Sequence, residues 1–208
     1  MTDNSKELRS NFEKQLQAFL KDGLSGRPGI KVTKNKVTIS QKESGAVATL
    51  NFAYLSNSRA YETIILVEAP SLQAELERIK PPYPSNLPNP KFVYSMSTVS
   101  EQDACPLLPV TEQGIATTCQ LILKRIVDVY LPLINKLLSL HPGLVEDVLS
   151  RPQYYCYPVP LIFLALNHSG ARPDQATLAR ILSEQTLGYT NHLELKTSFN
   201  QQLLATLA

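Results

Sequence analysis

Three runs of β-branched and aromatic residues dominate the first third of the chain and limit the folds it can adopt. They cover residues 36–42, 46–55 and 60–69, and the turn-like sequences KESG and SNSR separate them. Short strands joined by turns of this length pair with their neighbours in an antiparallel meander. The sequence therefore predicts a small antiparallel sheet over residues 36–68.

Helical spacing of apolar residues flanks the predicted sheet. Residues 5–22 place leucines and phenylalanines on one face of an opening helix. Residues 71–79 predict a second, short helix with Ser71 as its N-cap. The following segment, residues 81–90, contains five prolines in ten residues, which predicts an extended loop or linker.

The second half of the sequence is helical. After a last predicted strand at residues 91–99, apolar residues recur at helical spacing from residue 111 onward, and Pro132 is expected to kink the first long helix because it removes a backbone donor. The predicted fold class is α+β, with an N-terminal helix and a small antiparallel meander sheet followed by an all-helical C-terminal half. Residues 1–100 form an α+β unit of about four strands and residues 101–208 a helical region, and the two are free to share one core.

Composition and charge exclude several classes of protein. A hydrophobic content of 43% is typical of a globular protein, and a net charge of +2 is too small for a general nucleic-acid binder. The start of the sequence lacks the apolar stretch of a secretory signal, and no run is long enough to span a bilayer. Three cysteines without CxxC spacing fit a reducing compartment. We therefore expect a cytoplasmic protein without nucleic-acid or membrane partners.

The sequence RPQYYCYPVPLIFLALNHSGARP contains the most suggestive chemistry of the chain. Tyr154, Tyr155 and Tyr157 surround Cys156 just before a predicted helix, and His168 lies at the far end of that helix. The helical rise separates the thiol and the imidazole by roughly 15 Å, too far for a nucleophile and its base. A buried structural thiol beside a packed aromatic corner is the preferred interpretation. The alternative is that the tyrosines anchor a partner.

Recognisable catalytic and ligand-binding motifs are absent from the sequence. The histidines at positions 141, 168 and 192 lack the spacing of metal ligands. The glycines form no phosphate-binding loop, and no nucleophile elbow occurs. No catalytic residue, metal or cofactor is predicted.

The last part of the chain can be interpreted in two ways, as a DNA-binding helix-turn-helix or as a structural helical hairpin. Residues 173–199 offer two short helices connected through Gly188. The second helix would present Asn191, His192, Lys196 and Asn200 to DNA. Glu194 and the neighbouring leucines make this a poor base-reading face. A structural helical hairpin is the preferred interpretation.

The order of elements resembles that of small cytosolic bacterial immunity proteins encoded beside toxins. The resemblance is carried by LRSNFEKQLQAFL, by AVATLNFAYL with AYETIILVEA, and by the tail that begins TEQGIATTCQLILKRIVDVYLPLINKLL. It covers most of the chain as an order of elements and includes no signature residue. It implies a stoichiometric binder of another protein and transfers no functional position.

The expected function is non-catalytic binding of another protein, most concretely neutralisation of a cognate toxin by an immunity protein. A secretion chaperone that escorts an effector and an enzyme with a non-standard Cys/His site are the alternatives, and the oligomeric state is left open. The expected partner surface combines the tyrosine corner with two polar loops, and its residues are Tyr154, Tyr155, Tyr157, Arg59, Tyr61 and Tyr83.

Overall fold

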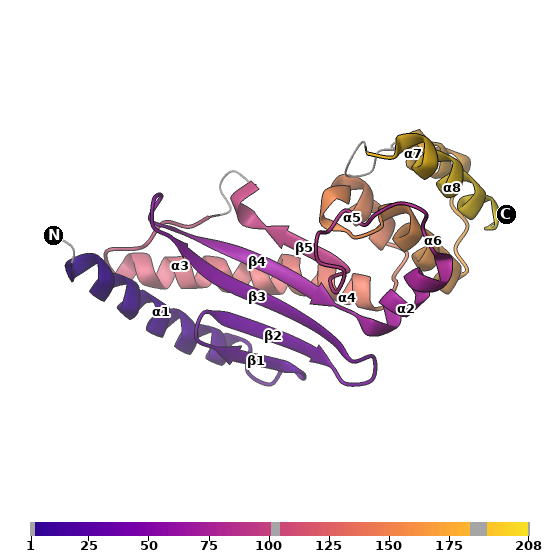
Figure 1. Ribbon diagram of the computed structural model, residues 1–208. Helices are drawn as coiled ribbons and strands as arrows, with labels where there is room; N and C mark the ends of the chain where they lie inside the picture. The colour runs from indigo at the N-terminus through magenta and orange to yellow at the C-terminus, as the bar shows by residue number, and fades with distance from the viewer. Residues whose placement is uncertain (1–2, 101–104, 184–190, 208) are drawn as a thin grey trace. The chain divides into compact units, whose positions relative to one another are not determined.

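The predicted α+β class is confirmed by a computed structural model, which describes residues 3–100, 105–183 and 191–207. Helix α1 (Asp3–Gly23) precedes an antiparallel meander, and helices fill the second half of the chain (Figure 1). The sheet has the strand order β1-β2-β3-β4-β5. Its strands are β1 (Ile30–Thr33), β2 (Lys36–Gln41), β3 (Ala46–Leu55), β4 (Ala60–Glu68) and β5 (Tyr94–Ser97).

The remaining elements are helical. They are α2 (Pro70–Ile79), η1 (Thr98–Ser100), α3 (Glu112–Arg125), η2 (Ile126–Tyr130), α4 (Leu131–Leu138), α5 (Leu144–Ser150), η3 (Pro152–Tyr154), α6 (Pro158–Ser169), α7 (Gln175–Ser183) and α8 (Leu193–Ala205). Gly170 ends α6 in the left-handed conformation, as expected for a C-capping glycine. Among the described residues, no helix combines the length and hydrophobicity needed to cross a lipid bilayer.

The chain packs as two compact units, each built from two separate stretches. Unit 1 comprises residues 1–66 and 96–132, and unit 2 comprises residues 67–95 and 133–208. Each unit therefore takes residues from both sides of the division near residue 100 that the composition suggested.

The core of unit 1 lies between one face of the sheet and the helices α1 and α3. Alternate residues of β2, β3 and β4 are buried, as the period of two requires for a sheet with one covered face. Phe12 and Leu16 of α1 and Ile115 of α3 are also buried. Gly23 ends α1 as predicted, and a Cβ atom there would collide with the Leu123 side chain, so α1 and α3 approach closely at this point.

Strand β1 was missed by the sequence analysis, which treated the basic run around it only as a charged edge. Ile30 pairs with Ile39 and Thr33 with Lys36, and Lys34 and Asn35 form the connecting turn. Asn35 adopts a left-handed conformation, which asparagine tolerates better than most residues. The strand does lie at the edge of the sheet and exposes Lys31 there, a feature that discourages strand addition.

Gly26 and Gly29, in the turn that precedes β1, provide a matched pair of substitutions. Gly26 and Gly29 have positive φ angles of 76° and 75°, but a Cβ atom on Gly29 would collide with the Ser40 carbonyl oxygen, whereas nothing lies within 4 Å at Gly26. We expect Gly29→Ala to lower the free energy of unfolding by about 2 kcal/mol and Gly26→Ala by about 1 kcal/mol. Urea unfolding followed by circular dichroism measures both, and equal losses would contradict the close approach.

Two helix starts differ from the sequence-based expectation. Helix α2 begins at Pro70 with Ala69 as its N-cap, two residues before the predicted cap Ser71, because proline suits the first helical turn. Helix α5 begins at Leu144, whereas the sequence favours Pro142 as a residue of its first turn. Pro132 disturbs its helix as expected, and the disturbance takes the form of the π-helical turn η2, in which the Leu131 N–H group donates to the Ile126 carbonyl.

The proline-rich segment 81–90 is a loop, as predicted, but it packs into unit 2 instead of acting as a linker. Tyr83 and Leu87 are buried, and so is Asn86. The Asn86 N–H group donates to the Cys156 carbonyl at 2.8 Å. The loop is therefore part of the core of unit 2.

Candidate functional site

The tyrosines around Cys156 form the packed aromatic corner that the sequence predicts. The Tyr155 ring lies 4.9 Å from the Tyr94 ring in an edge-to-face arrangement, and the Tyr154 ring lies 6.3 Å from Tyr94. Tyr157 contacts a different aromatic partner, since its ring centroid lies 6.0 Å from that of Tyr83. These rings stabilise unit 2 through apolar burial and edge-to-face contacts.

Burial limits the partner surface that the sequence suggested. Tyr61, Tyr83 and Tyr155 are buried, so their side chains cannot contact a partner in this conformation. Tyr154 and Tyr157 are half-buried, and Arg59 is exposed. The six residues do not form one cluster: Arg59 and Tyr61 belong to unit 1, and the other four belong to unit 2.

Tyr83 is held by two polar residues of α8. Its hydroxyl group donates to Asn200 Oδ1 at 2.8 Å, and Lys196 Nζ lies 5.5 Å from the centre of its ring. Lys196 and Asn200 are only 4% and 5% exposed, and burial lowers the pKa of Lys196. Two of the four residues offered to DNA in the helix-turn-helix alternative are thus turned into unit 2, whereas Asn191 and His192 are exposed. Gly188 of that motif lies outside the described residues.

Cys156 has the properties of a buried structural thiol. Burial raises its pKa to about 12, so the thiol is protonated at neutral pH and is a poor nucleophile. Its backbone N–H group donates to the Val93 carbonyl at 3.1 Å. His141 Nδ1 accepts a hydrogen bond from the Gly143 N–H group, and within the described residues no histidine is hydrogen-bonded to Cys156. The interpretation of Cys156 as a buried thiol is therefore confirmed.

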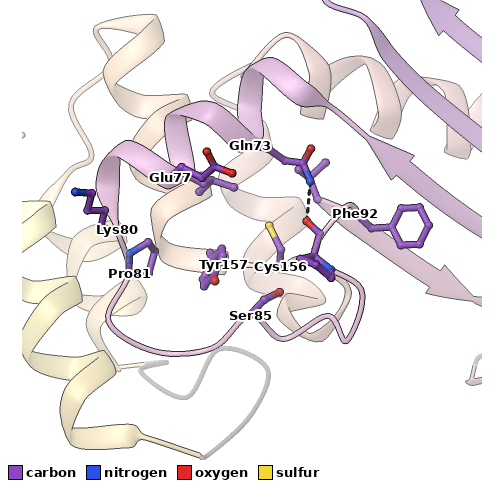
Figure 2. Close-up of a pocket in the computed structure, with 11 residues that line it drawn as sticks. Gln73, Glu77, Lys80, Pro81, Ser85, Phe92, Cys156 and Tyr157 are labelled. Atoms are coloured by element: carbon purple, nitrogen blue, oxygen red, sulfur yellow. Dashed lines mark hydrogen bonds between the residues drawn. The ribbon is translucent and has the colours of Figure 1, made fainter.

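A small pocket of about 260 Å³ lies beside Cys156 and Tyr157 in unit 2 (Figure 2). Helix α2 forms one wall, and the proline-rich loop forms another. In the part of the chain that the structure describes, no group of three or more His, Cys, Asp or Glu side chains is arranged to hold a metal ion.

A second candidate site lies on unit 1, next to the start of β4. The Tyr61 N–H group donates to the Pro106 carbonyl at 2.8 Å, and the Leu108 N–H group donates to the Arg59 carbonyl at 2.7 Å. These bonds place exposed Leu107 beside exposed Arg59. Thr98 Oγ1 lies 3.5 Å from Cys105 Sγ, which brings the residues around position 98 to the same segment.

Three large apolar side chains on this segment are more than half exposed. The exposed fractions are 56% for Val99, 68% for Leu107 and 63% for Val110. We call these three residues and Arg59 the apolar loop surface. Leu107 and Val110 were missed because they lie next to prolines in a stretch without helical or strand period. Val99 ends the predicted strand 91–99, and its exposure could not be inferred from that pattern. The apolar composition of PLLPV in such a stretch was the available signal.

A buried carboxylate, also missed from the sequence, links three elements of unit 1. Glu13 of α1 is 3% exposed and accepts hydrogen bonds from Arg9 Nε at 2.7 Å and from the Tyr61 hydroxyl at 3.2 Å. Lys34 Nζ lies 3.5 Å from its other oxygen. Burial by itself would raise the pKa of Glu13, but the bonds from Arg9, Asn35 and Tyr61 outweigh it and hold the pKa below its usual value. This cluster is structural, because it ties α1 to the β1–β2 turn and to β4.

Comparison of the chain with protein-family models, with curated proteins and with solved structures found no match. The resemblance to immunity proteins therefore rests on the order of elements alone. No residue role can be taken from a relative, and function has to be proposed from the geometry of the sites above.

Proposed function

We propose that this chain is a non-catalytic module that binds another protein through the apolar loop surface of unit 1. The observations that carry the proposal are that Val99, Leu107 and Val110 are each more than half exposed, and that backbone hydrogen bonds join the segment around Leu107 to Arg59 and Tyr61. Exposed apolar surface marks sites of protein interaction, and arginine is enriched among the residues that dominate binding energy in protein interfaces.

The apolar loop surface is also held in place before any partner binds. Two backbone hydrogen bonds to β4 fix the segment around Leu107, and Pro106 and Pro109 restrict its backbone. The Thr98 hydroxyl accepts a hydrogen bond from the Thr63 N–H group at 2.8 Å, which anchors the residue next to Val99. A rigid surface loses little conformational entropy on binding, which favours a tight, stoichiometric complex.

The most concrete form of the proposal is an immunity protein that neutralises a toxin by covering the toxin's functional site. Such a protein needs shape and charge complementarity and no catalytic residues. The buried, protonated thiol of Cys156 is consistent with this form, because the Cys/His alternative needs an accessible thiolate.

The test is capture of partners from source-cell lysate at high salt with the tagged chain and with Leu107→Asp. We expect one stoichiometric partner for the unchanged chain. With that partner purified, Leu107→Asp should weaken binding about 30-fold, because it places a charge in the centre of the apolar contact. Leu195→Asp is the matched control: Leu195 is 44% exposed on α8 in unit 2, and its replacement should leave the affinity unchanged.

The toxin version has its own readout. The purified partner should arrest growth when it is expressed alone, the unchanged chain should restore growth, and Leu107→Asp should not. A partner without toxicity would refute immunity and leave protein binding in place. A folded Leu107→Asp variant with unchanged affinity would refute the apolar loop surface itself.

A further inference from the structure

The pocket of unit 2 has a chemistry unlike that of the apolar loop surface. Helix α2 lines it with residues spaced by three and four, which share one helical face: Gln73, Leu76 and Glu77. Lys80, the C-cap of α2, also lines the pocket. Figure 2 shows Cys156, Tyr157 and Ser85 on the side opposite this face. At about 260 Å³ the pocket is smaller than the roughly 300–1,000 Å³ typical of sites for drug-sized ligands and cofactors. It suits a small metabolite.

The walls of the pocket are tied together by hydrogen bonds. Gln73 Nε2 donates to the Pro90 carbonyl at 2.7 Å, joining α2 to the end of the proline-rich loop (Figure 2). The Cys156 backbone is bonded to Val93 through its N–H group and to Asn86 through its carbonyl. A pocket held in this way is formed before a ligand enters it, so binding costs little conformational entropy.

Opposite charges lie at the rim of the pocket, and apolar side chains form its floor. Leu76, Val93 and Cys156 are buried, whereas Glu77 and Lys80 are exposed. Within the described residues no ion pair involves either Glu77 or Lys80.

The neighbouring Glu75 and Arg78 make a useful contrast. They are also three residues apart, and they form an ion pair in which Arg78 Nη1 lies 2.6 Å from Glu75 Oε1. Lys80 leaves the path of the helix, because it is the C-cap of α2 and adopts a left-handed conformation with a φ angle of 52°. Glu77 and Lys80 therefore present a carboxylate and an ammonium group at the rim of the pocket from different parts of the backbone.

We infer that this pocket binds a free α-amino acid with a small apolar side chain. The ligand's ammonium group meets Glu77, its carboxylate meets Lys80, and its side chain lies over Leu76 and Val93. An α-amino acid carries its ammonium and carboxylate groups on the same carbon, which matches a pocket with one carboxylate and one ammonium group among its lining residues. This inference goes beyond binding of a protein partner and involves a different unit of the chain.

Titration calorimetry on the full chain tests the ligand class. L-leucine is expected to bind with a Kd of about 1 mM or tighter. L-leucine methyl ester lacks the negative charge and N-acetyl-L-leucine lacks the positive charge, and each should bind at least about five-fold more weakly. Absence of leucine binding up to about 10 mM, or equal binding of all three compounds, would overturn the inference.

Two variants assign the charges separately. Lys80→Gln should weaken leucine binding about five-fold and remove the preference for leucine over its methyl ester. Glu77→Gln should do the same for the preference over N-acetyl-leucine. Glu75→Gln, a change on the same helix outside the pocket lining, should leave all three affinities unchanged. Variants at positions 77 and 80 that bind leucine normally would refute the assigned contacts.

The outcome is independent of the proposed partner. Leu107→Asp should lose the protein partner and still bind leucine, because Leu107 lies on unit 1 and the pocket lies within unit 2. Failure of leucine binding would leave the protein-binding proposal unaffected. Failure to find a protein partner would likewise leave the leucine proposal unaffected.

Discussion

Replacement of Tyr155 by alanine is expected to lower the free energy of unfolding by about 4 kcal/mol. Its side chain is 1% exposed, and its ring packs edge to face against Tyr94, so the substitution removes a large apolar group and leaves a cavity. Urea unfolding followed by far-ultraviolet circular dichroism measures the loss. The change should lower the urea concentration at the midpoint of unfolding, and the far-ultraviolet spectrum below the transition should stay the same.

Tyr154→Ala is the control for this prediction. Tyr154 is the preceding residue in the same corner, but it is half-buried and lies 6.3 Å from Tyr94, so we expect a loss of about 1–2 kcal/mol. Equal losses at the two positions would contradict the packing described here. A triple tyrosine substitution would unfold this corner, and partner binding is better tested with Tyr154 and Tyr157 changed singly.

Glu13→Ala is expected to cost about 3 kcal/mol at neutral pH. The change leaves the buried Tyr61 hydroxyl without its acceptor and removes the carboxylate that Arg9 and Lys34 approach. Arg9 remains 45% exposed and can be solvated, so most of the loss comes from Tyr61 and from the packing of α1 on the sheet. Glu7→Gln, an exposed change on the same helix, should cost less than about 0.5 kcal/mol.

The cost of Glu13→Ala should depend on pH in a definite direction. The pKa of Glu13 is lower in the folded protein than in the unfolded chain, so the carboxylate contributes stability at pH values above the ordinary glutamate pKa of about 4.3. This contribution is lost as the pH falls through the lower folded-state pKa. Urea midpoints measured from pH 7 down to pH 3 should show the unchanged chain and the variant converging. A constant difference would contradict the role given to the Glu13 charge.

Much of the fold follows from hydrophobic period alone. Strands β2, β3 and β4 and helices α1 and α6 occur where the periods of two and of about 3.6 predict them. Strand β1 was missed because it has four residues, and the three lysines Lys31, Lys34 and Lys36 of its hairpin resemble a solvated run. Local patterns also cannot reveal units assembled from separate stretches, because that arrangement depends on contacts between distant residues.

The candidate sites were less accessible to sequence reasoning. The aromatic corner around Cys156 was predicted, since clustered tyrosines before an apolar helix favour burial. Lys196 and Asn200 would be accessible only in the helix-turn-helix alternative, which the sequence analysis did not prefer. The structure buries both against Tyr83, and α8 packs with its leucines at positions 193 and 195 exposed. Which face of a weakly amphipathic helix is covered is decided by its neighbours and not by its own pattern.

The division into two interleaved units has a consequence for synthesis of the chain. The polypeptide passes between the units after residues 66, 95 and 132. During translation, unit 1 lacks α3 until residues 112–125 have left the ribosome, and the segment 67–95 waits for residues 133–208 before its own core can close. Neither unit can therefore be made independently by stopping the chain near its middle. The core of each unit depends on helices that leave the ribosome later than its first residues.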